Sequence, residues 1–339
     1  MRASSSWFLF LPALVSLGFV ACSDNGNPAT DDSGVISKDG SVAVDGTTPP
    51  TDGGTTSDVF YNPDARPTDP CTPGAGPIRV RLLAGNITSG NKQSYEEGSG
   101  IRIFQALIPD VVMIQEFNYK NNSAGELREF VDVAFGKQFS FSRGGGQIPN
   151  GIVTRFPILS SGEWIDPRVT NRSFAWAQID VPGKKDLWAV SVHLLTSSST
   201  ERKLEGDALT AFIQTNVPAG AYVVIGGDFN TDMRSEELLP ALAPVVTIPA
   251  TFPDDGAGNG NTSTNRSKPY DWVLVDGALN TKEVPLVIKS KSFPTGLVFD
   301  TSVYTPLSDL MPPLLGGESK ASNMQHMAVA RDFELVCGQ

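Results

Sequence analysis

The sequence contains few of the residues that bind zinc, with three Cys and two His among its 339 residues. Structural and catalytic zinc sites need more clustered Cys and His than this, so the composition disfavours them. Basic residues are also scarce, because 26 Lys and Arg stand against 37 Asp and Glu, for a formal net charge of −11. This balance excludes a broad basic surface of the repressor or histone kind. An anionic substrate would need a metal ion to offset the repulsion.

The apolar stretch near the N-terminus is too short to cross a membrane. It runs over fifteen residues, 7–21, is interrupted by Pro12 and Ser16, and follows the single positive charge of Arg2. A membrane span needs about 20 apolar residues. The length and flanks are typical of the hydrophobic region of a signal peptide, so we expect residues 1–22 to direct export.

Small residues precede a cysteine at the end of this stretch, in the order Phe19-Val20-Ala21-Cys22. This order resembles a bacterial lipobox, although Phe19 departs from the usual Leu. The resemblance implies that Cys22 is lipidated and becomes the mature N-terminus, which would place the protein on a membrane of the cell envelope or at the cell surface. Ordinary cleavage near Ala21 is the alternative, and it would release a secreted protein with Cys22 as a thiol.

Residues 23–76 almost lack large apolar side chains and contain no Glu. They hold nine Asp against Lys38 and Arg66, and are otherwise rich in Gly, Thr, Pro and Ser. Such a segment cannot bury enough apolar surface to offset its ordering entropy. We expect a disordered, self-repelling linker between the lipid anchor and a domain over residues 77–339.

The other two cysteines, Cys71 and Cys337, bracket this expected domain. In an exported protein, two cysteines so placed indicate a disulfide that joins the ends of the domain. Two free thiols are the alternative.

The body of the chain alternates between strand and helix patterns. Ile78, Val80 and Leu82 alternate with Arg79 and Arg81, which predicts a strand with one solvent-facing side. Further strands are predicted at 111–114, 151–154, 174–181, 187–194, 222–225, 272–275 and 326–335, and helices at 101–107, 123–135, 201–215 and 235–242. Many strands with hairpins and a few helices predict an α/β (α+β) fold of two packed sheets with helices outside.

Polar side chains follow several of the predicted strands, at the point where each strand ends. They are Asn86, Glu116, His193, Asp228 with Asn230, and His326. Because ligands collect at strand ends along one edge of a sheet, we expect these side chains to form one site. The chain has only two histidines, and both fall in this set.

This set of residues suits attack of water on a phosphoester. Glu116 and Asn86 offer the oxygen ligands that a hard divalent cation such as Mg²⁺, or Mn²⁺ or Ca²⁺, prefers. A His held by a carboxylate can orient or deprotonate the water. A Ser-His-Asp hydrolase is a weaker interpretation, because the chain has no Gly-x-Ser-x-Gly motif.

The order of these motifs resembles the endonuclease/exonuclease/phosphatase superfamily, the deoxyribonuclease-I-like proteins. The resemblance covers about residues 77–336 and rests on a set of segments in order: Asn86, Gln115-Glu116, Ser191-Val192-His193-Leu194, Gly226-Gly227-Asp228-Phe229-Asn230-Thr231, Tyr270-Asp271-Trp272 and His326. It implies a four-layered α/β sandwich, with two packed mixed sheets flanked by helices.

The resemblance also implies roles for single residues. Glu116 would be the principal Mg²⁺ ligand, with Asn86 beside it. Asp228 and Asn230 would position the scissile phosphate and the attacking water. Asp271 would orient His326, and the pair would act on water or phosphate. His193 would contact the phosphate and assist the leaving group, and Arg172 and Arg155 are candidate phosphate contacts.

One position departs from the family pattern. The superfamily usually has Asp immediately before its last His, and this chain has Gln325. Because that Asp often helps to hold a metal, we expect one divalent ion and doubt a second.

These observations predict an exported, metal-dependent phosphodiesterase, most simply a monomeric nuclease that meets the membrane only through its lipid anchor. Nucleic acid is the favoured substrate. A phospholipid or sphingomyelin phosphodiesterase, or a phosphoinositide phosphatase, is the alternative, since a membrane tether would bring the enzyme to lipid head groups. A catalytically weakened binding module, with Gln325 as the mark of decay, is an alternative of another class.

Overall fold

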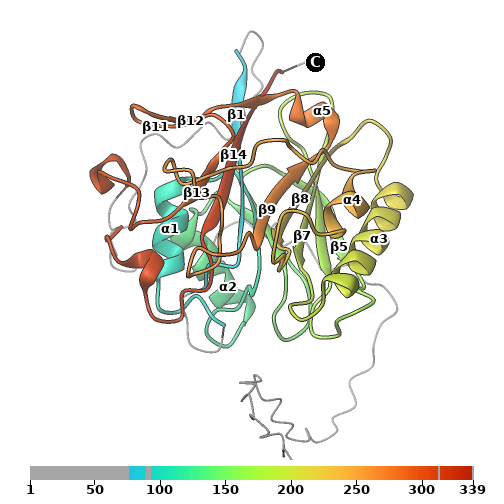
Figure 1. Cartoon of the computed structure of the whole chain (residues 1–339), viewed down its shortest axis with the longest axis horizontal. Helices are drawn as coiled ribbons and strands as arrows, with labels where there is room; N and C mark the ends of the chain where they lie inside the picture. The colour runs from blue at the N-terminus through green and yellow to red at the C-terminus, as the bar shows by residue number, and fades with distance from the viewer. Residues whose placement is uncertain (1–75, 89–92, 312–313, 338–339) are drawn as a thin grey trace, which may run out of the picture. The chain divides into compact units, whose positions relative to one another are not determined.

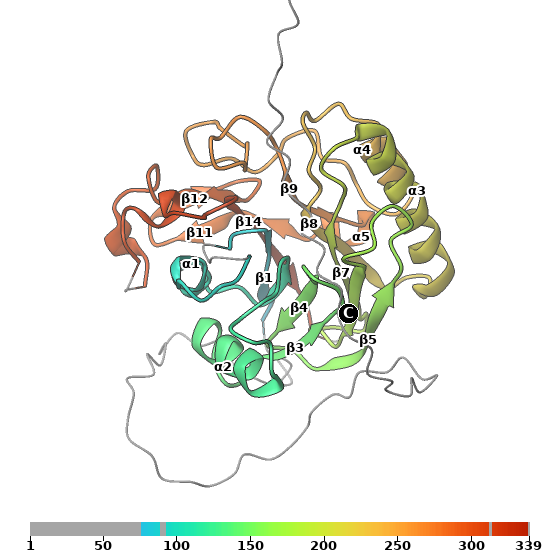
Figure 2. The ribbon, with the colours of Figure 1, turned by 90° about the horizontal axis from the view of Figure 1, so that it is seen from below.

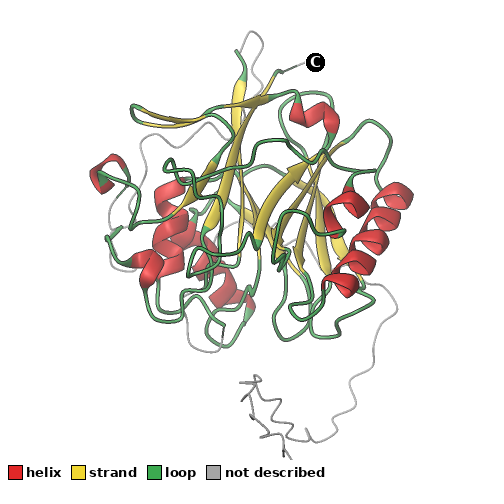
Figure 3. Cartoon of the chain, in the orientation of Figure 1, coloured by secondary structure: helices red, strands yellow, loops and turns green. Residues whose placement is uncertain are grey.

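Two β-sheets packed face to face form the centre of the structure, a computed structural model that describes residues 76–88, 93–311 and 314–337 (Figure 1). Helices α1 and α2 lie beside one sheet, and α3 and α4 lie beside the other (Figure 2). Coloured by secondary structure, the strands occupy the middle and the main helices the two outer sides (Figure 3). The predicted four-layered α/β sandwich is therefore confirmed.

The first sheet has seven strands in the order β10-β14-β1-β2-β4-β3, with β13 also paired to β14. Its strands are β1 (Ile78–Gly85), β2 (Val111–Ile114), β3 (Ser140–Arg143), β4 (Gly151–Thr154), β10 (Glu283–Val284), β13 (Leu297–Phe299) and β14 (Ala328–Leu335). Strand β1 is parallel to β2 and antiparallel to β14. The sheet is therefore mixed, as predicted.

The second sheet has five strands in the order β5-β6-β7-β8-β9. They are β5 (Ile158–Trp164), β6 (Phe174–Ile179), β7 (Leu187–His193), β8 (Tyr222–Asp228) and β9 (Asp271–Val275). Strands β6 and β7 form the predicted antiparallel hairpin, and β7 and β8 are parallel. A separate hairpin joins β11 (Leu286–Ile288) to β12 (Lys291–Phe293).

Four of the helices match predicted ones, although the last of these begins at Leu238 and not at residue 235, and α5 was not predicted. The helices are α1 (Ser99–Leu107), α2 (Ala124–Ala134), α3 (Ser199–Asn216), α4 (Leu238–Leu242) and α5 (Gly277–Asn280), with 3-10 turns η1 (Leu307–Asp309) and η2 (Glu318–Lys320). Helix α2 begins with a capping box, in which Ser123 accepts from the Glu126 amide and the Glu126 carboxylate accepts from the Ser123 amide. Both exchanges satisfy amide groups that a helix start otherwise leaves unpaired.

Three apolar clusters fill the spaces between the four layers. The cluster between the sheets includes Val80, Leu82, Met113, Val224 and Val273. The outer clusters pack α1 and α2 on the first sheet and α3 and α4 on the second. Strands such as β2 and β8 are consequently buried on both faces, which explains their continuous apolar sequences.

Strand β1 differs from its predicted form, because it has no solvent-facing side at Arg81. The Arg81 side chain is buried, and its Nε lies 2.7 Å from Asp332 Oδ1 on the neighbouring strand β14. Arg79, two residues earlier, is half-buried near Asp332 and Glu334. At Arg81 the alternation thus reflects a buried ion pair, whereas Arg79 stays partly exposed to water.

Several predictions fall on residues outside the described ranges. The signal peptide at 1–22, lipidation at Cys22 and the linker at 23–76 stay predictions. The pairing of Cys71 with Cys337 also stays a prediction, because Cys71 is not among the described residues. Within the ranges that the structure describes, no helix is long and apolar enough to cross a membrane.

Candidate active site

The polar residues that follow the strands lie at one edge of the two sheets. Asn86 follows β1 and Glu116 comes two residues after β2, and these strands are parallel neighbours. In the second sheet, His193 is level with Asp228 and Asp228 is level with Asp271, as aligned strand pairs. Parallel neighbours end at the same edge, so the pairing itself gathers these side chains.

Two glycines allow β8 to carry Asp228 into this site. Gly226 packs against the first sheet, where a Cβ would stand 2.4 Å from the Met113 methyl group and 3.0 Å from Ala84. Gly227 has a φ of 137° and adjoins the Val192 carbonyl and the Gln115 amide. A larger residue at either position would push the sheets apart or strain the backbone. The Gly-Gly-Asp motif is therefore a packing requirement within strand β8.

Glu116 is a buried carboxylate held in an uncommon backbone conformation. Its φ is 50°, in the left-handed region, and its side chain is only 1% exposed. A non-glycine residue in this region costs free energy and is often found at functional sites. Asn86 Nδ2 donates to Glu116 Oε1 at 2.8 Å, and Gln325 Nε2 donates to Oε2 at 2.8 Å.

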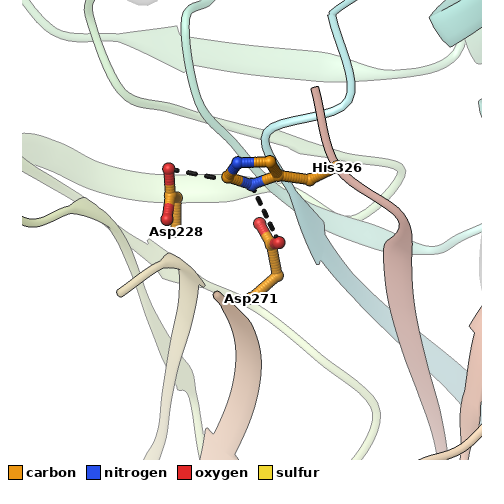
Figure 4. A group of neighbouring side chains, drawn as sticks. All are labelled: Asp228, Asp271 and His326. Carbon is orange, nitrogen blue, oxygen red and sulfur yellow. Dashed lines mark ion pairs between the residues drawn. The ribbon is translucent and has the colours of Figure 1, made fainter. Parts of the chain in front are cut away.

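Asp271, His326 and Asp228 form the centre of the site (Figure 4). His326 Nδ1 lies 2.9 Å from Asp271 Oδ2 and 3.7 Å from Asp228 Oδ2. The Asn86 backbone amide donates to the other Asp271 oxygen at 3.0 Å, which ties the first sheet to the second at this point. The Tyr270 ring, 5.0 Å from the His326 ring between centroids, packs beside the imidazole.

His193 lies on the other side of Asp228. Its Nε2 is 3.3 Å from Asp228 Oδ2, and its side chain is buried. Asp228 therefore lies between the two histidines, and Asn86 Nδ2 reaches the same Oδ2 atom at 3.4 Å. The structure brings Asn86, Glu116, His193, Asp228, Asp271 and His326 together in one connected cluster.

Burial and crowded charge shift the pKa values of these groups. Burial raises the pKa of Asp228 to about 7, against the attraction of His326 and with help from Asp271. Burial alone would lower the pKa of His326, but the charges of Asp271 and Asp228 outweigh it and raise the pKa to about 9. Burial also raises the pKa of Glu116 and lowers that of His193 well below its usual value.

The donor set fits a hard divalent cation. Asp228, Asp271 and His326 each bring a possible ligand atom within 4.8 Å of the others. His326 could bind a metal ion only after losing its proton, which leaves the carboxylates and the neighbouring amide as the donors at neutral pH. Beside this group, Asn86 Oδ1 is buried and has no hydrogen-bond partner among the described residues. A buried carbonyl oxygen without a donor is costly, and a cation near Glu116 would satisfy it.

The sequence profile of the Endonuclease/Exonuclease/phosphatase family matches residues 89–309, more than half of the chain. The chain belongs to this family. No curated protein sequence matches the chain.

Solved structures similar to this endonuclease/exonuclease/phosphatase chain in fold include the following two. A functionally unknown conserved protein from Enterococcus faecalis V583 is 11% identical, with a TM-score of 0.52, over 74% of this chain and 98% of its own. An endonuclease/exonuclease/phosphatase from Beutenbergia cavernae DSM 12333 is 17% identical, with a TM-score of 0.51, over 76% of this chain and 72% of its own. At these identities the likeness supports the fold alone.

Asn230 and Arg172, two further predicted site residues of this family member, support the backbone around the site. The Asn230 amide donates to Asp228 Oδ1 at 2.9 Å, and its side-chain Nδ2 donates to the Leu194 carbonyl at 2.9 Å. Arg172 is buried, and its guanidinium donates to the carbonyls of His193 at 2.5 Å and Leu194 at 3.0 Å. Arg172 therefore supports the backbone under His193, where the sequence had suggested a phosphate contact.

Arg155 is not part of the site. It follows β4, which is antiparallel to β2, and so lies at the strand end opposite Glu116. There Arg155 Nε is 2.5 Å from Asp110 Oδ1, with both side chains buried. The motif around Arg155 resembled the family, but antiparallel pairing carries the residue to the far edge of the sheet.

Sequence reasoning missed three residues that contact the site. Thr88 Oγ1 and Gln93 Nε2 each lie 3.3 Å from an oxygen of Glu116. Ser191 Oγ accepts from Gln115 Nε2 at 2.7 Å and so links the two sheets beside Glu116. The position of Thr88, two residues after Asn86, was an available signal, because alternate residues of an extended segment point the same way.

Proposed function

We propose that the protein is a divalent-metal-dependent phosphodiesterase that hydrolyses its substrate by attack of water, with nucleic acid as the favoured substrate. The contact series that runs from Asp271 through His326 to Asp228 and His193 carries this proposal. Family membership supports phosphoester chemistry in general. The crowding of Glu116, Asp228 and Asp271 around Asn86 and His326 is consistent with the need for a cation.

The two central residues divide the proton chemistry between them. With a pKa of about 9, His326 is protonated at neutral pH and can donate to a phosphate oxygen. Its Nδ1 faces Asp271, which leaves Nε2 for the substrate. Asp228, with a pKa of about 7, lies near the value at which a group accepts a proton from attacking water most effectively.

His193 and the cation complete the proposed mechanism. Burial keeps His193 neutral, so it can donate one N–H to a phosphate oxygen or to the leaving oxygen without adding charge. Glu116 and Asn86 would hold the cation, which would offset phosphate charge and polarise the phosphorus centre. Asn86 meanwhile keeps Asp271 aligned through its backbone amide.

The test uses the full chain with and without Mg²⁺, beside His326→Ala. Duplex DNA, single-stranded RNA, sphingomyelin and inositol phosphates form the substrate panel. We expect metal-dependent hydrolysis of nucleic acid and a loss of roughly 100-fold or more in His326→Ala. Lys120→Ala, at an exposed residue paired with Glu129, is the control and keeps full activity.

Each other outcome contradicts a stated part of the proposal. Hydrolysis of sphingomyelin or inositol phosphates alone would replace the substrate class. Turnover that persists after a chelator has removed divalent cations would show that hydrolysis does not require a metal. A folded protein that binds Mg²⁺ but hydrolyses nothing would favour the binding module, and Gln325→Asp would be the next variant.

We also propose that the protein is exported and anchored by lipid at Cys22. The apolar stretch and the small residues before Cys22 support this. Cells fed labelled palmitate should incorporate label into the protein, and Cys22→Ser should abolish incorporation. Label that persists in Cys22→Ser would contradict the anchor.

A further inference from the structure

The two oxygens of Glu116 are held by different groups. Oε1 accepts from Asn86 Nδ2 at 2.8 Å and from Gln93 Nε2 at 3.3 Å. Oε2 accepts from Gln325 Nε2 at 2.8 Å and from Thr88 Oγ1 at 3.3 Å. Gln325 Nε2 also donates to Thr88 Oγ1 at 2.9 Å, so these two side chains act on Oε2 as a connected pair.

The two oxygens also differ in what lies beyond them. The Asn86 amide that holds Oε1 lies 3.4 Å from Asp228 Oδ2, so Oε1 adjoins the acidic cluster. The buried Asn86 Oδ1, which lacks a hydrogen-bond partner among the described residues, is on the same amide. Turning that amide would remove the shorter of the two hydrogen bonds to Oε1, leaving only the 3.3 Å contact from Gln93, and would present Oδ1 next to Oε1. Oε2 would keep both of its donors.

We propose that Gln325 is a positioning residue: with Thr88 it holds Oε2 of Glu116, and it thereby leaves Oε1 as the oxygen that Glu116 offers to a divalent cation. This inference rests on the cation in the proposed function. It gives Gln325 a role of its own, in contrast to the interpretation of this residue as a mark of decay.

A neutral amide suits this role for a physical reason. Hydrogen bonds to a charged group are stronger than those between neutral groups, so Gln325 and Thr88 limit rotation of the carboxylate. An amide donates without adding charge, whereas an Asp or Glu at 325 would repel Glu116 unless protonated. Gln325 is only partly buried, so replacing its side chain leaves the apolar core intact.

Isothermal titration of Mg²⁺ into the full chain tests the role without any substrate. Gln325→Met keeps the length of the side chain and removes its donor, and we expect it to weaken Mg²⁺ binding roughly tenfold. Thr88→Val should weaken binding by less, and Thr88→Ser, which keeps the hydroxyl, should bind as the wild type does. Gln105→Met is the matched control, because the exposed Gln105 amide donates to the Val133 carbonyl on α2 and touches none of these residues.

The double variant Gln325→Met/Thr88→Val separates positioning from direct ligation. Because both side chains act on Oε2, their effects should be smaller together than the sum of the two single losses. Strictly additive losses would overturn the inference in favour of Gln325 as a cation ligand. Wild-type affinity in Gln325→Met would overturn it and leave the proposed function standing, whereas a wild-type protein that binds no divalent cation would overturn both.

Discussion

The two ends of the central strands both bury carboxylates, but they pair them with different partners. At one end of β2 and β4, Arg155 meets Asp110 at 2.5 Å, and Arg81, which lies beside Asp110 midway along β1, meets Asp332 at 2.7 Å. At the other end, Glu116, Asp228 and Asp271 contact amides, a hydroxyl and imidazoles. We refer to these as the arginine end and the site end.

This difference distinguishes carboxylates that stabilise the fold from carboxylates that are available for chemistry. A guanidinium that faces each carboxylate compensates it in place and leaves no capacity for a further ligand. The Asp228 carboxylate instead contacts two imidazoles and an amide, and burial together with the nearby charge of Asp271 raises its pKa. The position of Arg155 is therefore informative, since it marks the end of the strands that holds the fold and not the end proposed to bind substrate.

Breaking a pair at the arginine end should have the largest effect on stability. Asp332→Asn leaves Arg81 buried beside a neutral amide, and we expect it to lower the free energy of unfolding by about 3–5 kcal/mol. Urea denaturation measures this change. Asp132→Asn, at a partly exposed partner of Arg128, is the control and should change stability by less than about 1 kcal/mol. Equal effects of the two variants would show that the buried pair stabilises the fold no more than a partly exposed one.

The equivalent change at the site end should reduce activity strongly and stability little or not at all. Asp228→Asn removes one of several crowded carboxylates, so stability should be unchanged or raised, while hydrolysis falls by roughly 100-fold or more. Urea denaturation and turnover are measured on the same preparation. A large loss of stability in Asp228→Asn would show that this carboxylate holds the fold as Asp332 does.

The site end should also make stability depend on pH. The pKa of Asp228 is raised in the native state to about 7, and that of His326 to about 9, so the native state binds more protons than the unfolded chain. Both groups contribute stability at low pH. The contribution of Asp228 is lost as pH rises from about 4 to about 7, and that of His326 is lost as pH rises from about 6.5 to about 9. Denaturation of the metal-free protein across this range measures the slope, which Asp228→Asn should reduce below pH 7. An unchanged slope in that variant would assign the pH dependence to other groups.

The smallest effect is expected from the cation itself. Mg²⁺ at ten times its Kd should stabilise the native state by about 1.4 kcal/mol, because it binds the folded chain and not the unfolded one. Thermal denaturation with and without Mg²⁺ measures the shift in Tm, and Glu116→Gln should diminish it. Asp110→Asn, at the arginine end, should lower Tm with and without Mg²⁺ and leave the shift between them intact.

Strand patterns were sufficient to predict the sandwich and most of the site. Asn86, Glu116, His193 and Asp228 each stand at or just after the end of an apolar strand, and neighbouring parallel strands must end at a common edge. Family motifs then assigned Asp271, which begins a strand. This information lies in short stretches of sequence, where a run of apolar residues is followed by a polar one.

What the sequence could not predict depends on contacts between distant segments. Arg81 lies 251 residues from Asp332, so its alternation with apolar neighbours indicated a solvent-facing side that does not exist. The carbonyl contacts of Arg172 likewise depend on how β7 ends beside it. Strands β10 to β13 have only two or three residues each, too few for a pattern to emerge.

The place of β14 in the first sheet links folding to the order of synthesis. Strand β14 pairs with β1 over most of its length, from Ile78 opposite Leu335 to Ala84 opposite Val329, and His326 lies two residues before it. A ribosome-bound chain that has been made only as far as residue 325 therefore lacks both the antiparallel partner of β1 and one of its two histidines. The partner strand of β1 and the last residue of the proposed catalytic group are therefore both supplied by residues 326–335, so a chain that stops before His326 would lack the two together.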